Sequence, residues 1–148
     1  MTIRKATQAD VDTIHELGNS VGEFTVNAET VNFWPKEVLA NVIQSDDGLM
    51  FVAEDTGVVG FVIINYNHGF KKALIENIYV MPDKRGQGVG SKLLEHMFTS
   101  LVDIGCQYVT SLVPPDAQGA IELYKRSGFS QGEQFVWLDR ILTVDFKR

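Results

Sequence analysis

The sequence predicts a mixed α/β fold, in which a mostly antiparallel central sheet of six to seven strands is flanked by about four helices. Three apolar, strand-like runs between residues 49 and 80 are separated by short turns, as in consecutive hairpins. The third run leads through a glycine-rich loop into a long helical pattern and then into another strand pattern. A strand–helix–strand unit of this kind makes its two strands, the fourth and the fifth, parallel neighbours.

Length and composition limit the function classes. The chain has 148 residues, so we treat 1–148 as a single domain, and 45% hydrophobic residues suffice for a core. The net charge of −6 opposes a nucleic-acid partner and weakly favours a cationic substrate. A lone cysteine, Cys106, excludes an internal disulfide, and no run resembles a signal peptide or the roughly twenty apolar residues of a membrane span. We expect a cytoplasmic protein that binds neither nucleic acid nor membrane.

The first third of the chain predicts one strand and two helices. The strand is expected at Thr2 to Ala6, and Thr7 can cap the helix that follows. Pro35 fits the first turn of the second helix. The apolar stripes of the two helices are Val11, Ile14 and Leu17, and Val38, Leu39, Val42 and Ile43.

The middle of the chain predicts three strands joined by hairpin turns. The strands are expected at Leu49 to Glu54, Val58 to Tyr66 and Lys71 to Val80. Both turns contain glycine, in Asp55-Thr56-Gly57 and in Asn67-His68-Gly69. Consecutive hairpins make these three strands antiparallel to one another.

The last part predicts a helix, a strand, a helix and one or two final strands. The helix begins near Gly88 and ends near Gly105, and Asp116 can cap the next one, which Gly128 ends as a C′ residue. The expected strands are Gln107 to Val113, which Pro114 stops, then Phe129 to Ser130 and Gln134 to Phe146.

The loop from Arg85 to Gly90 has the chemistry of a phosphate site. Glycines let a backbone curl around an anion, and the helix that follows presents unpaired N–H groups and the positive end of its dipole. The dinucleotide fingerprint does not fit, because the third glycine comes one residue early, and Gly90-Ser91-Lys92 has the wrong order for a P-loop. An NAD or ATP site is therefore a poor match, and a glycine turn without a ligand is the other alternative.

Two motifs do match a known family. Arg85, Gly88 and Gly90 fill the pattern Arg/Gln-x-x-Gly-x-Gly/Ala, and Ala120 to Phe129, AIELYKRSGF, fits A-x-x-L-Y-x-x-x-G-F. With the opening IRKATQADVDTI and the element order, the chain resembles the GNAT superfamily of acyl-CoA-dependent N-acetyltransferases over nearly its whole length. The resemblance implies the GNAT fold, with strands four and five splayed. One departure is Ala117, where the family often has asparagine.

The resemblance implies a binding site for acetyl-CoA as the acetyl donor, without a metal. Backbone groups of the fourth strand would pair with the pantetheine arm, and an amide there would donate to the thioester carbonyl. The loop amides and their neighbours would bind the pyrophosphate. The implied residues are Ile78, Tyr79, Val80, Arg85, Gly86, Gln87, Gly88, Val89, Gly90 and Ser91.

The resemblance also implies two catalytic residues. Tyr124 is the motif tyrosine that protonates the leaving thiolate, and a phenol with a pKa near 10 suits that role. Glu76 lies in an apolar strand, where family members often carry a glutamate as general base; burial would raise its pKa towards that range. Alternation along the strand leaves open which face Glu76 uses, so a solvated or salt-bridged carboxylate is the alternative.

The resemblance leads us to expect direct acetyl transfer to a primary amine in a ternary complex. A covalent route through Cys106 is disfavoured because no histidine lies near it in sequence, and the three histidines lack metal-ligand spacing. The acceptor stays open between a small amine and a protein N-terminus or lysine, and a homodimer also stays open. A non-catalytic acyl-CoA-binding or regulatory module on the same fold is the alternative function. Candidates for the acceptor site are Phe24, Phe33, Trp34, Tyr66, Phe135 and Trp137.

Overall fold

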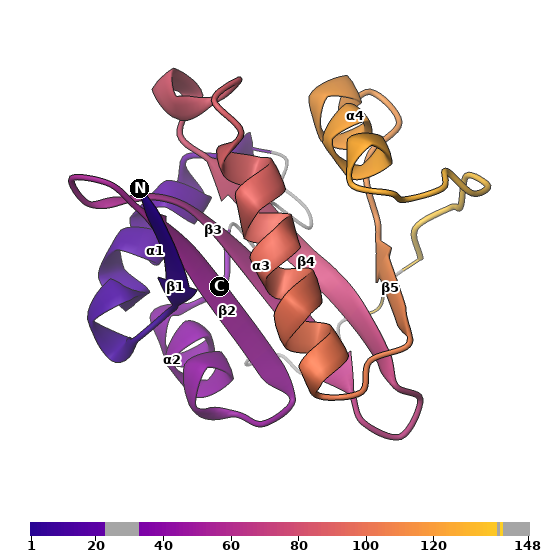
Figure 1. Ribbon diagram of the computed structural model, residues 1–148, viewed down its shortest axis with the longest axis horizontal. Coiled ribbons are helices and arrows are strands. Elements are labelled where there is room, and N and C mark those ends of the chain that lie inside the picture. The colour runs from indigo at the N-terminus through magenta and orange to yellow at the C-terminus, as the bar shows by residue number, and fades with distance from the viewer. Residues whose placement is uncertain (23–32, 139, 141–148) are drawn as a thin grey trace.

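The computed structural model describes residues 1–22, 33–138 and 140, and it contains a five-stranded sheet with helices on both faces (Figure 1). The strands are β1 (Thr2–Lys5), β2 (Gly48–Glu54), β3 (Val58–Asn67), β4 (Lys72–Val80) and β5 (Tyr108–Ser111). The helices are α1 (Val11–Asn19), α2 (Lys36–Gln44), α3 (Val89–Asp103) and α4 (Gln118–Arg126), with short 3-10 turns η1 (Gln8–Asp10) and η3 (Pro82–Lys84). Within the described residues, no helix is long and apolar enough to cross a membrane.

The sheet confirms the predicted topology. Its strands follow chain order, with antiparallel pairs from β1 to β4 and a parallel pair between β4 and β5. The tight turns between β2, β3 and β4 produce the antiparallel pairs, whereas the crossover through α3 produces the parallel one.

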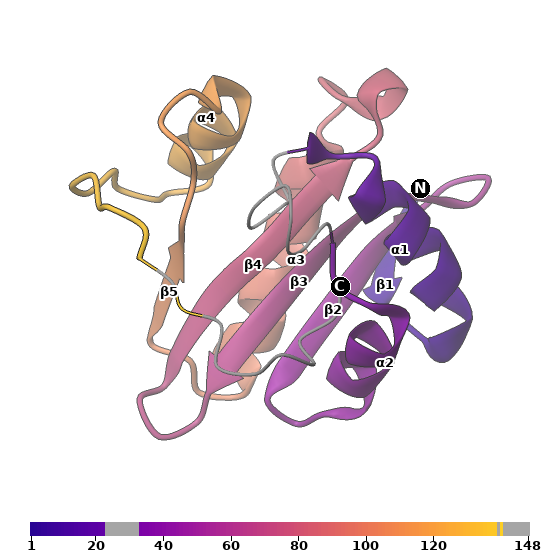
Figure 2. The ribbon, with the colours of Figure 1, turned by 180° about the vertical axis from the view of Figure 1, so that it is seen from behind.

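Two hydrophobic layers cover the sheet. α3 packs on one face, where its buried stripe includes Leu93, Met97 and Leu101. α1 and α2 cover the opposite face around Ile14 and Leu39, as Figure 2 shows from behind. Side chains of β3 and β4 alternate between these layers, so the layer to which a residue belongs tells which face it uses.

A one-residue bulge interrupts β4 beside the predicted base. Ile64 of β3 pairs with Ile75, but Ile63 pairs with Asn77, so Glu76 is the extra residue on β4. Ile75 belongs to the α3 layer, whereas Ile63, which pairs with Asn77, belongs to the α1–α2 layer. Glu76 follows Ile75 and accepts a hydrogen bond from Asn65, whose neighbours Ile64 and Tyr66 both belong to the α3 layer, so strand alternation places Asn65 on the opposite face. Glu76 and Asn77 therefore both point to the α1–α2 face.

β4 and β5 separate after the bulge. Their pairing runs from Lys72–Tyr108 to Ile75–Ser111 and stops there. β5 is shorter than the predicted Gln107 to Val113, because the strand loses its partner at the bulge and Pro114 follows closely. α4 begins after the prolines and ends at Arg126, and the φ of +91° at Gly128, after the C-cap Ser127, confirms the predicted C′ residue.

The expected number of six to seven strands is not reached among the described residues, which form five. Phe129 to Ser130 does not form a strand, because the turn after α4 holds Phe129 through a bond from its N–H to the Tyr124 carbonyl. Of the strand expected at Gln134 to Phe146, residues 134–138 are not in a strand, and most of the remainder lies outside the described residues.

A buried ion pair fixes the start of the helical layer to the sheet. Arg4 of β1 donates to both carboxylate oxygens of Asp10 at 2.8 and 2.9 Å and also to Glu54 of β2. Thr7 donates to Asp10 through its N–H and its hydroxyl, at 2.7 and 3.0 Å. Arg4 lowers the pKa of Asp10 to about 2, mainly through these hydrogen bonds.

Candidate active site

The separation of β4 from β5 opens a cleft of about 1730 Å³. Its described walls come from β4, β5, α4, the residues before α2 and the segment after α4. A cleft at the carboxyl ends of diverging parallel strands is where open α/β sheets bind their ligands. The bulge therefore creates the space and places Glu76 and Asn77 on its wall.

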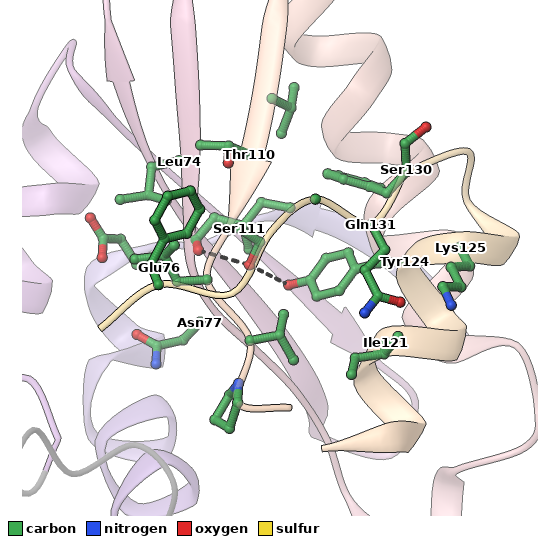
Figure 3. Close-up of a pocket in the computed structure, with 18 of the residues that line it drawn as sticks. Leu74, Glu76, Asn77, Thr110, Ser111, Ile121, Tyr124, Lys125, Ser130 and Gln131 are labelled. Atoms are coloured by element: carbon green, nitrogen blue, oxygen red, sulfur yellow. Dashed lines mark hydrogen bonds between the residues drawn. The ribbon is translucent and has the colours of Figure 1, made fainter. Parts of the chain in front are cut away.

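Tyr124 reaches this cleft from α4 and points towards β5 (Figure 3). Ser111 donates a hydrogen bond to the Tyr124 hydroxyl at 3.1 Å, and its hydroxyl lies 3.3 Å from the Ile75 carbonyl oxygen. While Ser111 donates to it, the phenol keeps its own proton for another partner. Burial raises the pKa of Tyr124, so the phenol stays protonated at neutral pH. Sequence reasoning missed Ser111, because its role depends on the β4–β5 register.

The turn after α4 holds the Tyr124 ring in place. Gly128 reverses the chain, and Phe129 then packs edge-on against Tyr124 with 5.0 Å between ring centroids. Tyr124 is 7% exposed, so its ring is a core residue while its hydroxyl faces the cleft. The motif residues of α4 thus serve packing and positioning together.

Glu76 lies on the cleft wall beyond Ser111 from Tyr124, and Figure 3 shows the two on opposite sides of that serine. Burial raises the pKa of Glu76, and the hydrogen bond from Asn65 only partly opposes this shift. A carboxylate with a raised pKa is a better proton acceptor at neutral pH. The structure answers which face Glu76 uses, since it lines the cleft and forms no salt bridge among the described residues.

The glycine loop lies between η3 and α3. Gly86 and Gly88 have φ values of +73° and +80°, which side chains rarely adopt, and a Cβ at either position would point into open space. Gly88 is the residue before α3, so the first amides of that helix, from Val89 to Ser91, lie at its positive end. The loop fits a phosphate group by its backbone conformation and its open side.

Other predicted loop residues have structural contacts. A Cβ on Gly90 would lie 2.9 Å from Leu123, so this glycine lets α3 and α4 approach and does not line the open side. The Gln87 side chain donates to the Asp83 carbonyl at 2.9 Å. Arg85 Nε donates to the Val80 carbonyl at 2.9 Å, which folds the arginine back over the end of β4.

The end of β4 has one edge without a neighbouring strand among the described residues. β3 pairs with β4 up to Val80, but β5 pairs only up to Ile75, so the other edge of Ile78, Tyr79 and Val80 has no strand beside it among the described residues. The Tyr79 side chain is buried and stacks on Phe61 at 5.6 Å. Tyr79 therefore has only backbone groups to offer a ligand, and the pairing of this edge with a pantetheine arm stays a prediction.

The acceptor-site candidates fall into three groups. Phe33, Trp34, Phe135 and Trp137 line the cleft. Tyr66 does not; it is buried under α3, because β3 alternation places it on that face. Phe24 lies outside the described residues. Cys106 is away from the cleft walls, and no group of three or more potential metal ligands occurs in the described part of the chain.

Comparisons with known proteins match this geometry. The model of the acetyltransferase (GNAT) family matches residues 20–129. An uncharacterized N-acetyltransferase of Methanocaldococcus jannaschii is 32% identical over 139 residues, which span 89% of this chain but only 62% of that protein. An L-amino acid N-acyltransferase of Escherichia coli is 26% identical over 87% of this chain and 79% of its own length.

Solved structures agree on the fold. The ribosomal-protein-S18-alanine N-acetyltransferase of Escherichia coli superposes with a TM-score of 0.72 and 25% identity, over 89% of this chain and 79% of that one. An aminoglycoside N-acetyltransferase in complex with CoA gives a TM-score of 0.76 at 18% identity, over 95% and 99% of the two chains. With a family model that covers most of the sequence, the chain belongs to the GNAT family of acetyltransferases and is an acyltransferase.

Proposed function

We propose that the protein transfers an acetyl group from acetyl-CoA directly to a primary amine, with both substrates bound in the cleft where β4 and β5 separate. One observation carries the proposal: a single bulge in β4 opens this cleft and puts Glu76 on its wall, while Ser111 holds Tyr124 on the opposite side. Relatives named for transfer to amino acids and to aminoglycosides support an amine acceptor.

In this proposal the chain binds acetyl-CoA through backbone groups. The amides of Gly86 to Ser91 hold the pyrophosphate, and the free edge of Ile78 to Val80 pairs with the pantetheine arm. An amide of the same strand donates to the thioester carbonyl oxygen, which stabilises negative charge as it develops there. Backbone recognition tolerates the Ala117 departure from the family motif.

Two side chains move protons in the chemical step. Glu76 takes a proton from the amine, directly or through a water, so that the amine nitrogen can attack the thioester carbonyl carbon. A C–N bond forms, the C–S bond breaks, and the nitrogen loses its second proton to water. Tyr124 donates its phenol proton to the departing sulfur, which leaves as the free thiol. Solvent then returns a proton to Tyr124 and removes one from Glu76, and the products are an amide and CoA.

The test is thiol release from acetyl-CoA in the presence of a panel of primary amines, with product mass measured in parallel. Direct transfer predicts that each thiol released accompanies one acetylated amine, and that no acetylated protein accumulates without an amine. If CoA binds but no amine in the panel is acetylated, the chain is a non-catalytic acyl-CoA-binding module on this fold. That alternative would bind CoA through the same glycine loop, but Tyr124 and Glu76 would have no catalytic role in it.

A further inference from the structure

Trp34 is held at both its backbone and its side chain. Its indole N–H donates to Oδ1 of Asn77 at 2.7 Å, and its carbonyl oxygen lies 3.0 Å from Nδ1 of His15. The Asn19 amide nitrogen lies 3.0 Å from Nε2 of the same histidine. A neutral imidazole meets both partners at once, with Nδ1–H donating to Trp34 and Nε2 accepting from Asn19. Asn77 therefore holds the indole ring before any ligand arrives, and His15, which Asn19 contacts, holds the backbone that carries it.

The anchor of the indole is the residue next to Glu76. The bulge turns Asn77 and Glu76 to the same face of β4, so the ring and the carboxylate share one wall of the cleft. Trp34 is half-buried, which leaves part of the ring in contact with the cleft. A fixed indole beside a carboxylate suits an ammonium group, because a cation is attracted by the face of tryptophan more than by any other aromatic ring.

The rest of the cleft suits an uncharged, apolar body. Beyond Trp34, the apolar side chains that line it include Phe33, Leu74 and the four-residue run 135–138. The charged side chains among its described lining residues are Glu76, Glu133 and Lys125. A second or third ammonium on the acceptor would lose hydration against these apolar side chains, with Glu133 as the one further described carboxylate to offset the loss.

We propose that the acceptor is a primary amine with a single positive charge and a flat or bulky apolar body, and that the fixed Trp34 indole beside Glu76 selects it. This inference rests on the proposed acetyl transfer and adds the class of acceptor. It sets the protein apart from an enzyme built for polycations, whose site would need several carboxylates around the acceptor.

The experiment compares kcat/KM for three amines at fixed acetyl-CoA: 2-phenylethylamine, 2-cyclohexylethylamine and spermidine. We expect both apolar monoamines to exceed spermidine by roughly tenfold or more, and 2-phenylethylamine to be the better of the two. In Trp34→Leu, kcat/KM for 2-phenylethylamine should fall about five- to thirtyfold, the equivalent of a desolvated cation–π contact, mainly through KM. Trp34→Phe keeps a ring but loses the bond to Asn77, so its loss should be smaller.

The KM for 2-phenylethylamine does not depend on the folded fraction, so a destabilised variant still gives a result. Phe70→Leu is the matched control, because Phe70 is 82% exposed in the β3–β4 turn and away from the cleft; it should leave the KM values for 2-phenylethylamine and acetyl-CoA unchanged. A wild-type preference for spermidine, or an unchanged KM for 2-phenylethylamine in Trp34→Leu, overturns the acceptor class while acetyl transfer stands. Release of thiol with none of the amines overturns acetyl transfer and this inference with it.

Discussion

Replacing Asp10 with asparagine should destabilise the protein by an amount that depends on pH. Asp10 is 6% exposed and accepts hydrogen bonds from Arg4 and Thr7, and its pKa is lowered from 3.8 to about 2. A shift of this size is equivalent to roughly 2 kcal/mol of folding free energy for the ionised carboxylate. Losing a buried partner often costs more, but Arg4 keeps its bond to Glu54 and is itself part-exposed, so the smaller figure should hold.

This stabilisation has a defined pH window. Because the folded pKa is below the unfolded one, the contribution is complete above about pH 4 and disappears as the pH falls through about 2. For a chain of this length, 2 kcal/mol corresponds to a fall in Tm of about 4–8 °C at neutral pH. Wild-type protein and Asp10→Asn should then converge in stability as the pH approaches 2.

Urea unfolding from pH 7 down to pH 2 measures the difference directly, provided the m-value stays constant. Asp12→Asn is the matched control: Asp12 pairs with Lys36 at 2.7 Å, but its side chain is 77% exposed, so its loss should leave the midpoint almost unchanged. A difference between wild type and Asp10→Asn that persists unchanged at pH 2 would refute the reasoning, as would an equal loss in Asp12→Asn.

Four further substitutions, one of them with a matched control, test the proposed chemistry. Tyr124→Phe should lower kcat by roughly 10²–10⁴-fold with little change in CoA affinity, because it removes only the hydroxyl that Ser111 bonds. Full turnover by a variant that binds CoA with wild-type affinity in calorimetry would exclude the phenol as the acid. Burial raises the pKa of Glu76, so the acidic limb of the wild-type rate–pH profile should lie above the ordinary glutamate range, and Glu76→Gln should remove this limb. The rate of Glu76→Gln should approach that of the wild type as the pH rises, because more of the amine is then neutral. An unchanged profile would place the general base elsewhere. Gly88→Ala should weaken CoA binding measured by calorimetry. Gly105→Ala, at a similar φ of +85° beyond the other end of α3, should lower stability by a similar amount and leave CoA affinity unchanged. Equal CoA affinities in the two variants would contradict a phosphate site at the glycine loop. Cys106→Ala should keep full activity, since the thiol lies off the cleft, and mass spectrometry of the wild type with acetyl-CoA alone should find it unmodified.

Local signals in the sequence predicted most of the fold. The hairpins around residues 55–57 and 67–69 follow from short-range turn chemistry, and the parallel β4–β5 pair follows from the handedness and length of its crossover. Gly128 was predictable as a helix end because glycine readily adopts the positive φ of a C′ residue. The end of β5 was not, because it depends on where β4 bulges, and the sequence of β5 carries no sign of an event on its neighbour.

The candidate site could be predicted only in part. Tyr124 and the glycine loop came from motifs with fixed spacing, and Glu76 came from a charge in an apolar strand. The Ser111–Tyr124 bond and the Trp34–Asn77 bond each connect residues on different elements of the fold, so no local sequence pattern predicts them. Gly90 shows another limit: a motif glycine was expected at a phosphate, but its contact is with Leu123 of a helix that follows much later.

The bulge at Glu76 also sets the pattern that saturation mutagenesis of β4 should reveal. Before the bulge, the odd-numbered residues Ala73 and Ile75 lie under α3; after it, the even-numbered Ile78 does, and the odd-numbered Tyr79 faces α1 and α2. Tolerance to polar residues should thus alternate with period two and reverse its phase once, at Glu76. Deleting Glu76 would remove the bulge and restore one unbroken alternation in which every later side chain keeps its layer, so this deletion should spare the core and instead remove the divergence of β4 from β5.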